Sequence, residues 1–257
     1  MIDFVSSHFW NIATAAFIFL PLERLLPRNR TQGIFRQKWS MDLVYTLLGG
    51  IISTAGTIVT IIAGVFCFSH MVPEGVKTFI VSQNLILQVI AIAFIADLWY
   101  YYAHRLFHRM PALWKFHAIH HSIEDMDWLA AHRVHPVDQI LTTGVSLMIP
   151  IVLGFSAPAF AAYAVLRKWH SLLKHSNVNF GFGWLSKIFV SPTFHHWHHA
   201  NQIEAYDKNF AGVFSVIDRA FGTAIDNEEK GPEVYGVDDP LPNSFSAQMI
   251  APFKNAP

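Results

Sequence analysis

The sequence predicts an all-α integral membrane protein, a helix bundle of about three full spans plus a two-helix hairpin, with a cytoplasmic histidine-rich helical cap. Two observations lead to this fold class. Of the 257 residues, 53% are hydrophobic and 14% are charged, whereas an average soluble protein has about 25% charged residues. In addition, four regions lack any Asp, Glu, Lys or Arg, and each can supply a membrane-crossing helix of about 20 residues: residues 4–22, 43–73, 78–96 and 139–166.

The balance of charges excludes two other classes of protein. The 18 Lys and Arg residues are matched by 18 Asp and Glu residues, so no basic excess is present to bind a phosphate backbone, and no nucleic-acid partner is expected. The mean hydropathy of +0.32 is too high for a disordered chain. The single cysteine, Cys67, rules out an intramolecular disulfide and a cysteine-based zinc site.

The apolar regions predict spans at about 4–22, 43–66 and 83–103, then a hairpin of helices at about 138–153 and 158–175, because Pro and Gly interrupt the fourth region. Lysine and arginine concentrate in cytoplasmic connections. The connection between the second and third spans holds only Lys77, whereas the connection after the first holds Arg24, Arg28, Arg30, Arg36 and Lys38. We therefore expect a multi-pass protein with an external amino terminus, and with the histidine site and the carboxyl terminus in the cytoplasm.

Thirteen of the fifteen histidines fall within residues 104–199, and their spacing predicts metal binding. Residues four apart lie on one face of a helix, and imidazole is a good ligand for iron, copper and zinc. Eight clustered rings exceed the shell of one ion, since four-coordinate zinc would use half of them, so two metals in one pocket are expected. The three sets, each expected to aim its rings at one point, are His104 and His108; His117, His120 and His121; and His195, His198 and His199.

Three other histidines are expected to have ordinary structural roles. His196 lies outside the shared face of its set, so His196→Ala is expected to stay close to wild type. His8 and His70 lie far from the cluster in the sequence.

Asp97, Tyr101, His104 and His108 follow one another at steps of four, three and four, which predicts a single stripe on the third span. A carboxylate in an apolar helix is costly unless it is paired, and metal-bound imidazoles usually donate their second N–H to a carboxylate or carbonyl. Asp97 is therefore predicted to accept a hydrogen bond from a ligand such as His104, with Tyr101 beside it as a second candidate catalytic residue. The alternatives are that Asp97 reaches interfacial water or Arg105, and that Tyr101 is an interfacial aromatic.

Together these residues resemble the fatty acid hydroxylase/sterol desaturase superfamily of membrane-bound histidine-box enzymes. The resemblance covers about residues 95–224 and rests on the motifs Asp97-xxx-Tyr101-xx-His104-Arg105-xx-His108, His117-xx-His120-His121, His132-xx-His135-Pro136, His175-Ser176-Asn177, His195-xx-His198-His199 and Asp218-Arg219-Ala220-Phe221-Gly222-Thr223. It implies a non-haem di-iron enzyme that uses O2 to hydroxylate or desaturate lipid C–H bonds, with the three sets as ligands. It also implies His135 and His175 as further ligands, and His132 and His170 as residues that support or replace a ligand.

The chain is expected to divide into an amino-terminal transmembrane region (1–95), a catalytic domain (96–224) and a carboxyl-terminal tail (225–257). The expected cofactors are two iron ions, with zinc as a substitute in overexpressed protein. The expected partners are the membrane, O2, a lipid substrate (sterol, fatty acyl, sphingoid or related) and a separate electron donor of ferredoxin, cytochrome b5 or reductase type. The alternatives are a metal transporter and a non-catalytic metal-binding membrane protein, which iron content and O2-dependent product formation would distinguish.

Overall fold

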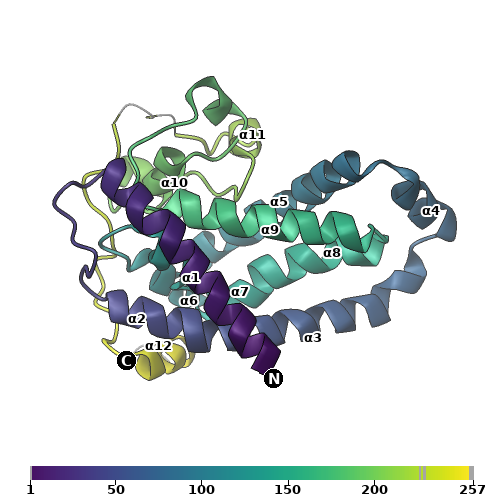
Figure 1. Cartoon of the computed structure of the whole chain (residues 1–257), viewed down its shortest axis with the longest axis horizontal. Helices are drawn as coiled ribbons and strands as arrows, with labels where there is room; N and C mark the ends of the chain where they lie inside the picture. Colours follow the sequence, from purple (N-terminus) through teal and green to yellow (C-terminus); the bar gives the residue numbers. More distant parts are fainter. Residues whose placement is uncertain (1, 226, 228–229, 255–257) are drawn as a thin grey trace.

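The computed structural model describes residues 2–225, 227 and 230–254, with side chains from Phe9 onward, so the side chain of His8 lies outside the described residues. The described residues form helices and loops without a β-strand (Figure 1). The α-helices are α1 (Ile2–Leu25), α2 (Trp39–Val44), α3 (Gly50–Phe68), α4 (Glu74–Ser82), α5 (Leu85–Arg109), α6 (Pro111–His121), α7 (Pro136–Gln139), α8 (Val145–Leu153), α9 (Ala157–His175), α10 (Pro192–His198), α11 (Ser215–Ala220) and α12 (Phe245–Ile250). π-Helical turns at Tyr45–Gly49 and Ile140–Gly144 join α2 to α3 and α7 to α8.

Among the residues whose side chains the structure describes, three helical stretches are long and apolar enough to cross a membrane: Trp39–Met71, Leu85–Arg109 and Pro136–Leu153. Large apolar side chains such as Ile62, Phe66 and Ile86 are exposed on them, as lipid-facing residues would be. At 1.5 Å per residue, α5 is about 37 Å long, which exceeds the roughly 30 Å of hydrocarbon in a bilayer. A helix of this length can span the bilayer and still project from it, and α5 carries His104 and His108 in its last turns.

The long helices run side by side between two different ends of the molecule. Figure 1 shows α3, α5, α8 and α9 extending from α4 at one end to the helices α6 and α10 at the other. Gly56 and Gly64 of α3 allow close approach to the hairpin, because a Cβ at either position would collide with Ile140 or Met148. Gly154 adopts φ +88° between α8 and α9, a left-handed conformation that suits glycine and closes the predicted hairpin.

The first predicted span forms α1, whose residues between Phe4 and Leu22 include no Asp, Glu, Lys or Arg. The candidate span that contains α7 and α8 corresponds to the first helix of the predicted hairpin. In α1, Ala15 and Phe19 pack against Trp128 and Leu172, which fixes α1 to the end of the molecule where the histidines lie.

Candidate metal centre

Nine histidines form two groups in which one nitrogen of every ring lies within 4.8 Å of the others. We call these groups the five-histidine cluster and the four-histidine cluster. All three predicted sets contribute to them, and so does His175, which the family resemblance implied. The five-histidine cluster consists of His104 and His108 from α5, His117 and His121 from α6, and His198 from α10; the four-histidine cluster consists of His120 from α6, His175 from α9, and His195 and His199 at α10.

The two larger sets each divide between the clusters, so the expectation that each set aims at one point is wrong. On α6, His117 and His121 join the five-histidine cluster, whereas His120 joins the other. Helical residues four apart differ by about 40° in direction, but adjacent residues differ by about 100°. His120 and His121 therefore point to different sides of α6, and the same division occurs on α10. Two short helices thus serve both clusters.

Hydrogen bonds donated by Nδ1 fix three rings of the five-histidine cluster. The Nδ1 of His104 donates to the carbonyl of Phe210 at 2.7 Å, and the Nδ1 of His198 donates to the carbonyl of Lys208 at 2.8 Å. The Nδ1 of His117 lies 2.7 Å from the buried carboxylate of Asp138. Because Nδ1 carries the proton in such a bond, the lone pair of the neutral ring is on Nε2, the atom available to a metal.

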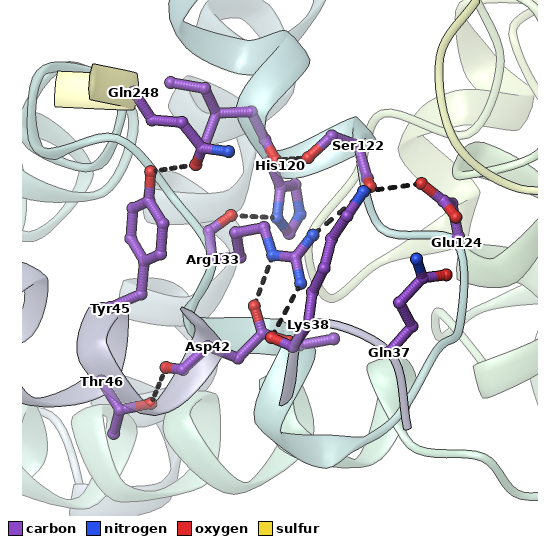
Figure 2. A network of polar contacts seen from close by, with 12 residues as sticks. Gln37, Lys38, Asp42, Tyr45, Thr46, His120, Ser122, Glu124, Arg133 and Gln248 are labelled. Carbon is purple, nitrogen blue, oxygen red and sulfur yellow. Dashed lines mark hydrogen bonds and ion pairs between the residues drawn. The ribbon is translucent and has the colours of Figure 1, made fainter. Parts of the chain in front are cut away.

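Two rings of the four-histidine cluster are fixed in the same way. The Nδ1 of His120 donates to the carbonyl of Arg133 at 3.0 Å, and that of His175 donates to the carbonyl of Ser171 at 2.7 Å. Figure 2 shows how the first of these acceptors is held, since the guanidinium of Arg133 forms an ion pair with Asp42 beside the ring of His120. Arg36 bridges the same Asp42 to Asp127. A buried network of charges therefore fixes the carbonyl that orients His120.

The Nε2 atoms of neighbouring rings face one another at short range. These separations are 2.9 Å for His104–His117, 3.1 Å for His117–His121, 3.0 Å for His121–His198, 3.2 Å for His120–His175, 2.9 Å for His175–His195 and 3.2 Å for His195–His199. Metal–nitrogen bonds of about 2.0–2.1 Å would place neighbouring ligands about 2.8–3.4 Å apart, depending on whether the angle between them is closer to 90° or to 109°. The observed separations fit ligands that share an ion.

Protonation states support the same fit. Burial lowers the pKa of His120 to about 3, so this ring is neutral near pH 7. His120 and His175 both donate through Nδ1, which leaves two lone pairs facing each other across 3.2 Å. Two lone pairs repel at this distance unless a cation lies between them. Burial also lowers the pKa of His121, His198 and His199 well below 6.5. Neutral imidazoles are the form that binds a metal.

Asp97 does not pair with His104, which corrects the sequence-based interpretation. Its carboxylate accepts hydrogen bonds from the backbone N–H groups of Gly212, Val213 and Phe214 at 2.7–3.0 Å. Asp218 likewise accepts from the N–H groups of residues 210 and 211 at 2.8 Å. The two carboxylates together hold five successive N–H groups, and the first residue of that loop supplies the carbonyl that orients His104. Asp97 therefore acts on His104 through the loop.

Tyr101 is fully buried rather than interfacial. Its hydroxyl lies 3.0 Å from Thr223 Oγ1 and accepts from Arg105 at 3.2 Å, while its ring stacks on Phe221. These contacts explain two residues of the Asp218–Thr223 motif as packing and hydrogen-bonding partners of α5. They bind Tyr101 to the same motif whose Asp218 holds the loop beside His104.

The remaining candidates lie outside both clusters. His135, implied as a ligand, instead accepts from Val137 N–H through Nδ1 at 3.1 Å and donates to the Met249 carbonyl at 3.2 Å. His170 donates to the Val190 carbonyl at 2.7 Å, and His132 borders a small cavity beside the four-histidine cluster. His135 starts α7, so both its nitrogens are used in capping that helix and binding the carboxyl-terminal segment.

His196 is absent from both groups, as predicted, but it is not a free surface residue. It is fully buried, with Nδ1 2.9 Å from the Tyr235 hydroxyl and Nε2 donating to the Ser176 carbonyl at 3.1 Å. His70, also expected to lie apart, is exposed in the turn between α3 and α4, and Figure 1 shows α4 at the opposite end of the long helices from α6 and α10.

Sequence reasoning missed Asp138 and Arg133, which hold His117 and His120. The signal for Asp138 was present, because it is a carboxylate in the first turn of an apolar helix, where an unpaired charge is costly. Arg133 acts on His120 through its backbone carbonyl, which no residue pattern reveals.

Two cavities border the clusters. A cavity of about 800 Å³ reaches His108, His121 and His198 of the five-histidine cluster and lies between α6 and the segments 200–207 and 236–254. A cavity of about 170 Å³ reaches His120 and His175 of the four-histidine cluster. Only the larger one has the size of a typical organic-ligand site.

The chain belongs to the fatty acid hydroxylase family, whose pattern matches residues 89–223, more than half of its length. It is 28% identical over 252 residues to ornithine lipid hydroxylase OlsE of Rhizobium tropici, which covers 94% of this chain and 74% of the relative. It is 33% identical over 149 residues to alkylglycerol monooxygenase of Homo sapiens, which covers 58% of this chain and 32% of the relative.

A third relative extends this range of lipids. Methylsterol monooxygenase 1 of Gallus gallus is 28% identical over 142 residues, which covers 54% of this chain and 46% of the relative. No solved structure matches the chain. The family and these relatives make the chain an oxidoreductase that acts on lipids.

Proposed function

We propose that this protein is a membrane-bound di-iron oxygenase that uses O2 and electrons from a separate protein to hydroxylate or desaturate a lipid. The observation that supports it most is the close approach of Nε2 lone pairs in two adjacent clusters, because each cluster then calls for one cation. Imidazole suits several metals, but redox-silent zinc cannot activate O2, which favours iron in an oxygenase. The nine clustered histidines would hold the two ions.

Bound iron would supply the activation of O2 that no side chain provides. The chain's own residues hold the imidazoles neutral and oriented: the carboxylate of Asp138 retains the Nδ1 proton of His117, and backbone carbonyls retain those of His104 and His120. Burial of both clusters limits the access of water to the reacting groups. Asp97 and Tyr101 are positioning residues in this proposal, since their polar atoms contact the loop 212–214, Thr223 and Arg105.

The larger cavity is the proposed substrate site, because it reaches three histidines of the five-histidine cluster. The relatives are named for ornithine lipid, alkylglycerol and methylsterol, and a lipid of one of these kinds is the proposed substrate class. Electrons would come from a separate ferredoxin, cytochrome b5 or reductase. We place the histidine site and the carboxyl terminus in the cytoplasm, because the basic residues between Arg24 and Lys38 precede the first candidate span. A reporter fused after Pro257 that is active only outside the cytoplasm would contradict this orientation.

The test combines metal analysis with turnover by the full-length protein. Protein purified with iron should contain about two metal ions per chain and lose activity with a chelator. Supplied with a membrane lipid extract, a reductase–ferredoxin pair and isotopically labelled O2, it should form a lipid that carries one labelled oxygen atom, or one with an added double bond. Two bound irons without any O2-dependent lipid product would favour the non-catalytic alternative, and metal uptake into vesicles would favour a transporter.

A further inference from the structure

The segment before α10 exposes large apolar side chains. It runs over residues 182–190 and includes the 3₁₀ turn Gly183–Lys187. The helix α11 lies beside it, since the N–H of Val216 donates to the carbonyl of Ile188 at 3.4 Å. We call the exposed apolar side chains of this segment, of α11 and of the residue after α11 the loop patch: Trp184, Leu185, Ile188, Phe189, Val216 and Phe221, each between 36% and 72% exposed. An apolar surface of this kind marks contact with a protein or a membrane.

The loop patch continues onto the apolar surface of α5. The ring centre of Phe214 lies 5.5 Å from that of Phe189 and 6.0 Å from that of Phe94 on α5, and Phe94 is itself exposed. The ring centre of Phe221 lies 5.4 Å from that of Tyr102, also exposed on α5, and α11 packs beside α5 (Figure 1). Because α5 is a candidate span, one continuous apolar surface joins a membrane-crossing helix to this loop.

The position of Asp97 on α5 shows the depth at which the loop lies. At 1.5 Å per residue, Asp97 is about 18 Å from Leu85 and about 18 Å from Arg109, so it stands at the middle of the helix. When α5 crosses a hydrocarbon core of about 30 Å, its middle lies inside that core. The carboxylate of Asp97 binds the backbone N–H groups of residues 212–214. The loop that leads into α11 therefore lies beside the part of α5 that is within the bilayer.

A second helix gives the same level. α9 begins beside the start of α5, since the N–H of Ser156 donates to the side chain of Gln88 at 3.0 Å. His170 lies about 20 Å further along α9 than Ala157, and it donates to the carbonyl of Val190 at 2.7 Å. Val190 is the last residue of the segment 182–190. Both helices thus place this segment next to the membrane-crossing part of the bundle.

The backbone of the segment is bonded as hydrocarbon requires. Irregular chain at membrane depth is tolerated only where its polar groups are satisfied without water. The carbonyl of Ser186 accepts from the hydroxyl of Ser215 at 2.6 Å and from Arg219 at 3.2 Å, and the carbonyl of Lys187 accepts from Arg219 at 3.0 Å. The N–H groups of residues 188–190 donate to carbonyls at 2.8–2.9 Å. The segment therefore combines an apolar exterior with a backbone that is bonded internally.

The charges near the loop patch favour a lipid surface. Residues 176–203 include no Asp or Glu, but they include the exposed Lys187. Acidic side chains would be repelled by the negative surface of a membrane. Tryptophan is typical of the boundary between hydrocarbon and head groups, and the stem of a lysine can lie on apolar surface while its ammonium reaches water. Trp184 and Lys187 are the residue types expected at that boundary.

We propose that residues 182–190 and the exposed face of α11 are embedded in the leaflet nearest the histidine clusters. Phe189 and Val216 contact acyl chains, whereas Trp184 and Lys187 lie at the level of the head groups. Part of the histidine-rich cap then belongs to the bilayer, although the sequence analysis expects it in the cytoplasm. This placement goes beyond the proposed function, because it requires neither a bound metal nor turnover.

The test measures the depth of nitroxide labels in full-length protein reconstituted into phosphatidylcholine liposomes. Cys67→Ser removes the single cysteine, and labels are attached to Ile188→Cys or Val216→Cys in that background. Val59→Cys, on the exposed surface of α3, is the lipid control, and Glu204→Cys, an exposed polar residue, is the aqueous control. Paramagnetic resonance compares collisions with O2, which concentrates in hydrocarbon, and with a water-soluble nickel chelate. The ratio of O2 to nickel collisions at positions 188 and 216 should be several-fold above that at 204 and close to that at 59.

Two results would overturn the proposal. One is frequent nickel collisions at 188 and 216, equal to those at 204, which would place the loop patch in water. The other is infrequent collisions with both reagents, which would show that protein covers the patch, as a second copy of the chain would.

Crosslinking of the unlabelled protein gives a measurement that no substitution can disturb. A phosphatidylcholine with a diazirine in its acyl chain should modify peptides that contain residues 182–190 and 214–221, and it should leave residues 200–207 unmodified. Modification of α3 without modification of residues 182–190 would contradict the placement. Lipid contact without any O2-dependent product would count against the proposed function alone.

Discussion

The two histidine clusters share α6 and α10 but differ in what lies beside them. The five-histidine cluster borders a cavity of about 800 Å³, whereas the four-histidine cluster borders one of about 170 Å³. They also differ in support, because a carboxylate, Asp138, holds a ring in the first, while backbone carbonyls hold the fixed rings of the second. The comparison teaches that two sets of similar side chains can have different access to a ligand: an organic molecule fits beside the five-histidine cluster, whereas the cavity beside the four-histidine cluster is too small for one.

Removing one ligand from each cluster is the strongest way to break this comparison. His121→Ala and His199→Ala should each abolish turnover and each lower the metal content from about two ions per chain to about one. If the clusters are separate sites, the double variant should retain none. His70→Ala, at an exposed residue of the turn Ser69–Met71 that belongs to neither cluster, is the control and should retain two. Elemental analysis decides, and the loss of both ions from a single variant would show that the clusters are one site.

Acid should destabilise the metal-free protein strongly. Burial lowers the pKa of His120 and His196 to about 3, below the unfolded value of about 6.5. Their contribution is therefore present above pH 6.5 and is lost as the pH falls toward 3, by up to about 1.4 kcal/mol per pH unit for each ring. Burial raises the pKa of Asp218 to about 6 and that of Glu23 to about 7, which has the opposite sign. These two carboxyl groups are outnumbered, because burial also lowers the pKa of His121, His198 and His199.

Thermal unfolding in detergent from pH 7.5 to 5 checks this prediction. The Tm of the metal-free protein should fall steeply below pH 6.5, while bound metal should reduce the fall, because it stabilises the neutral rings. A metal-free Tm that is flat over this range would show that the rings are charged or exposed.

Asp138→Asn tests the difference in support. The variant should lower activity or metal affinity by roughly 10–100-fold, because an amide can still contact His117 but cannot stabilise its N–H as a carboxylate does. The lost metal should be the ion that also requires His121, so combining the change with His121→Ala should add no further metal loss. A larger loss of metal in the double variant than in either single variant would show that Asp138 does not act through the five-histidine cluster.

Asp97→Asn should lower the stability of the fold more than it lowers the metal content. An asparagine side chain replaces one carboxylate oxygen with an NH2 group, which would face some of the three N–H groups from which the carboxylate now accepts hydrogen bonds. We expect this to lower the free energy of unfolding by about 2–4 kcal/mol. We expect a lower Tm, with His104 loosened because its acceptor, the Phe210 carbonyl, belongs to the same loop. A loss of metal at an unchanged Tm would instead indicate that Asp97 pairs directly with His104.

The smallest effect is expected at His196, where the structure revises the expectation of near-wild-type behaviour. His196→Ala removes bonds to Tyr235 and Ser176 and should cost about 1–3 kcal/mol of stability, while the metal content stays at about two. Tyr235→Phe is the matched variant and should lose less. Loss of metal from His196→Ala would indicate that it belongs to a cluster.

Sequence periodicity predicts contacts within one helix well and contacts between elements poorly. The i, i+4 relation of His117 and His121 holds, as does the exclusion of His196. The division of His120 from His121 depends on which helices pack on each side of α6, and no spacing encodes that packing. Asp97 was misassigned for the same reason, because its partners, Gly212 to Phe214, are more than a hundred residues away. Family resemblance pointed to His175, which lies in the four-histidine cluster, and to His135, which lies outside both clusters and whose nitrogens bind the backbone of Val137 and Met249.

The sharing of α10 also sets an order on biosynthesis. Both clusters draw histidines from residues 195–199, whereas the three candidate spans end by Leu153. Neither cluster can have its full set until the ribosome has made His199, after every candidate span has already been translated. If the clusters bind metal as proposed, neither ion can therefore find its complete set of ligands before the candidate spans have been made.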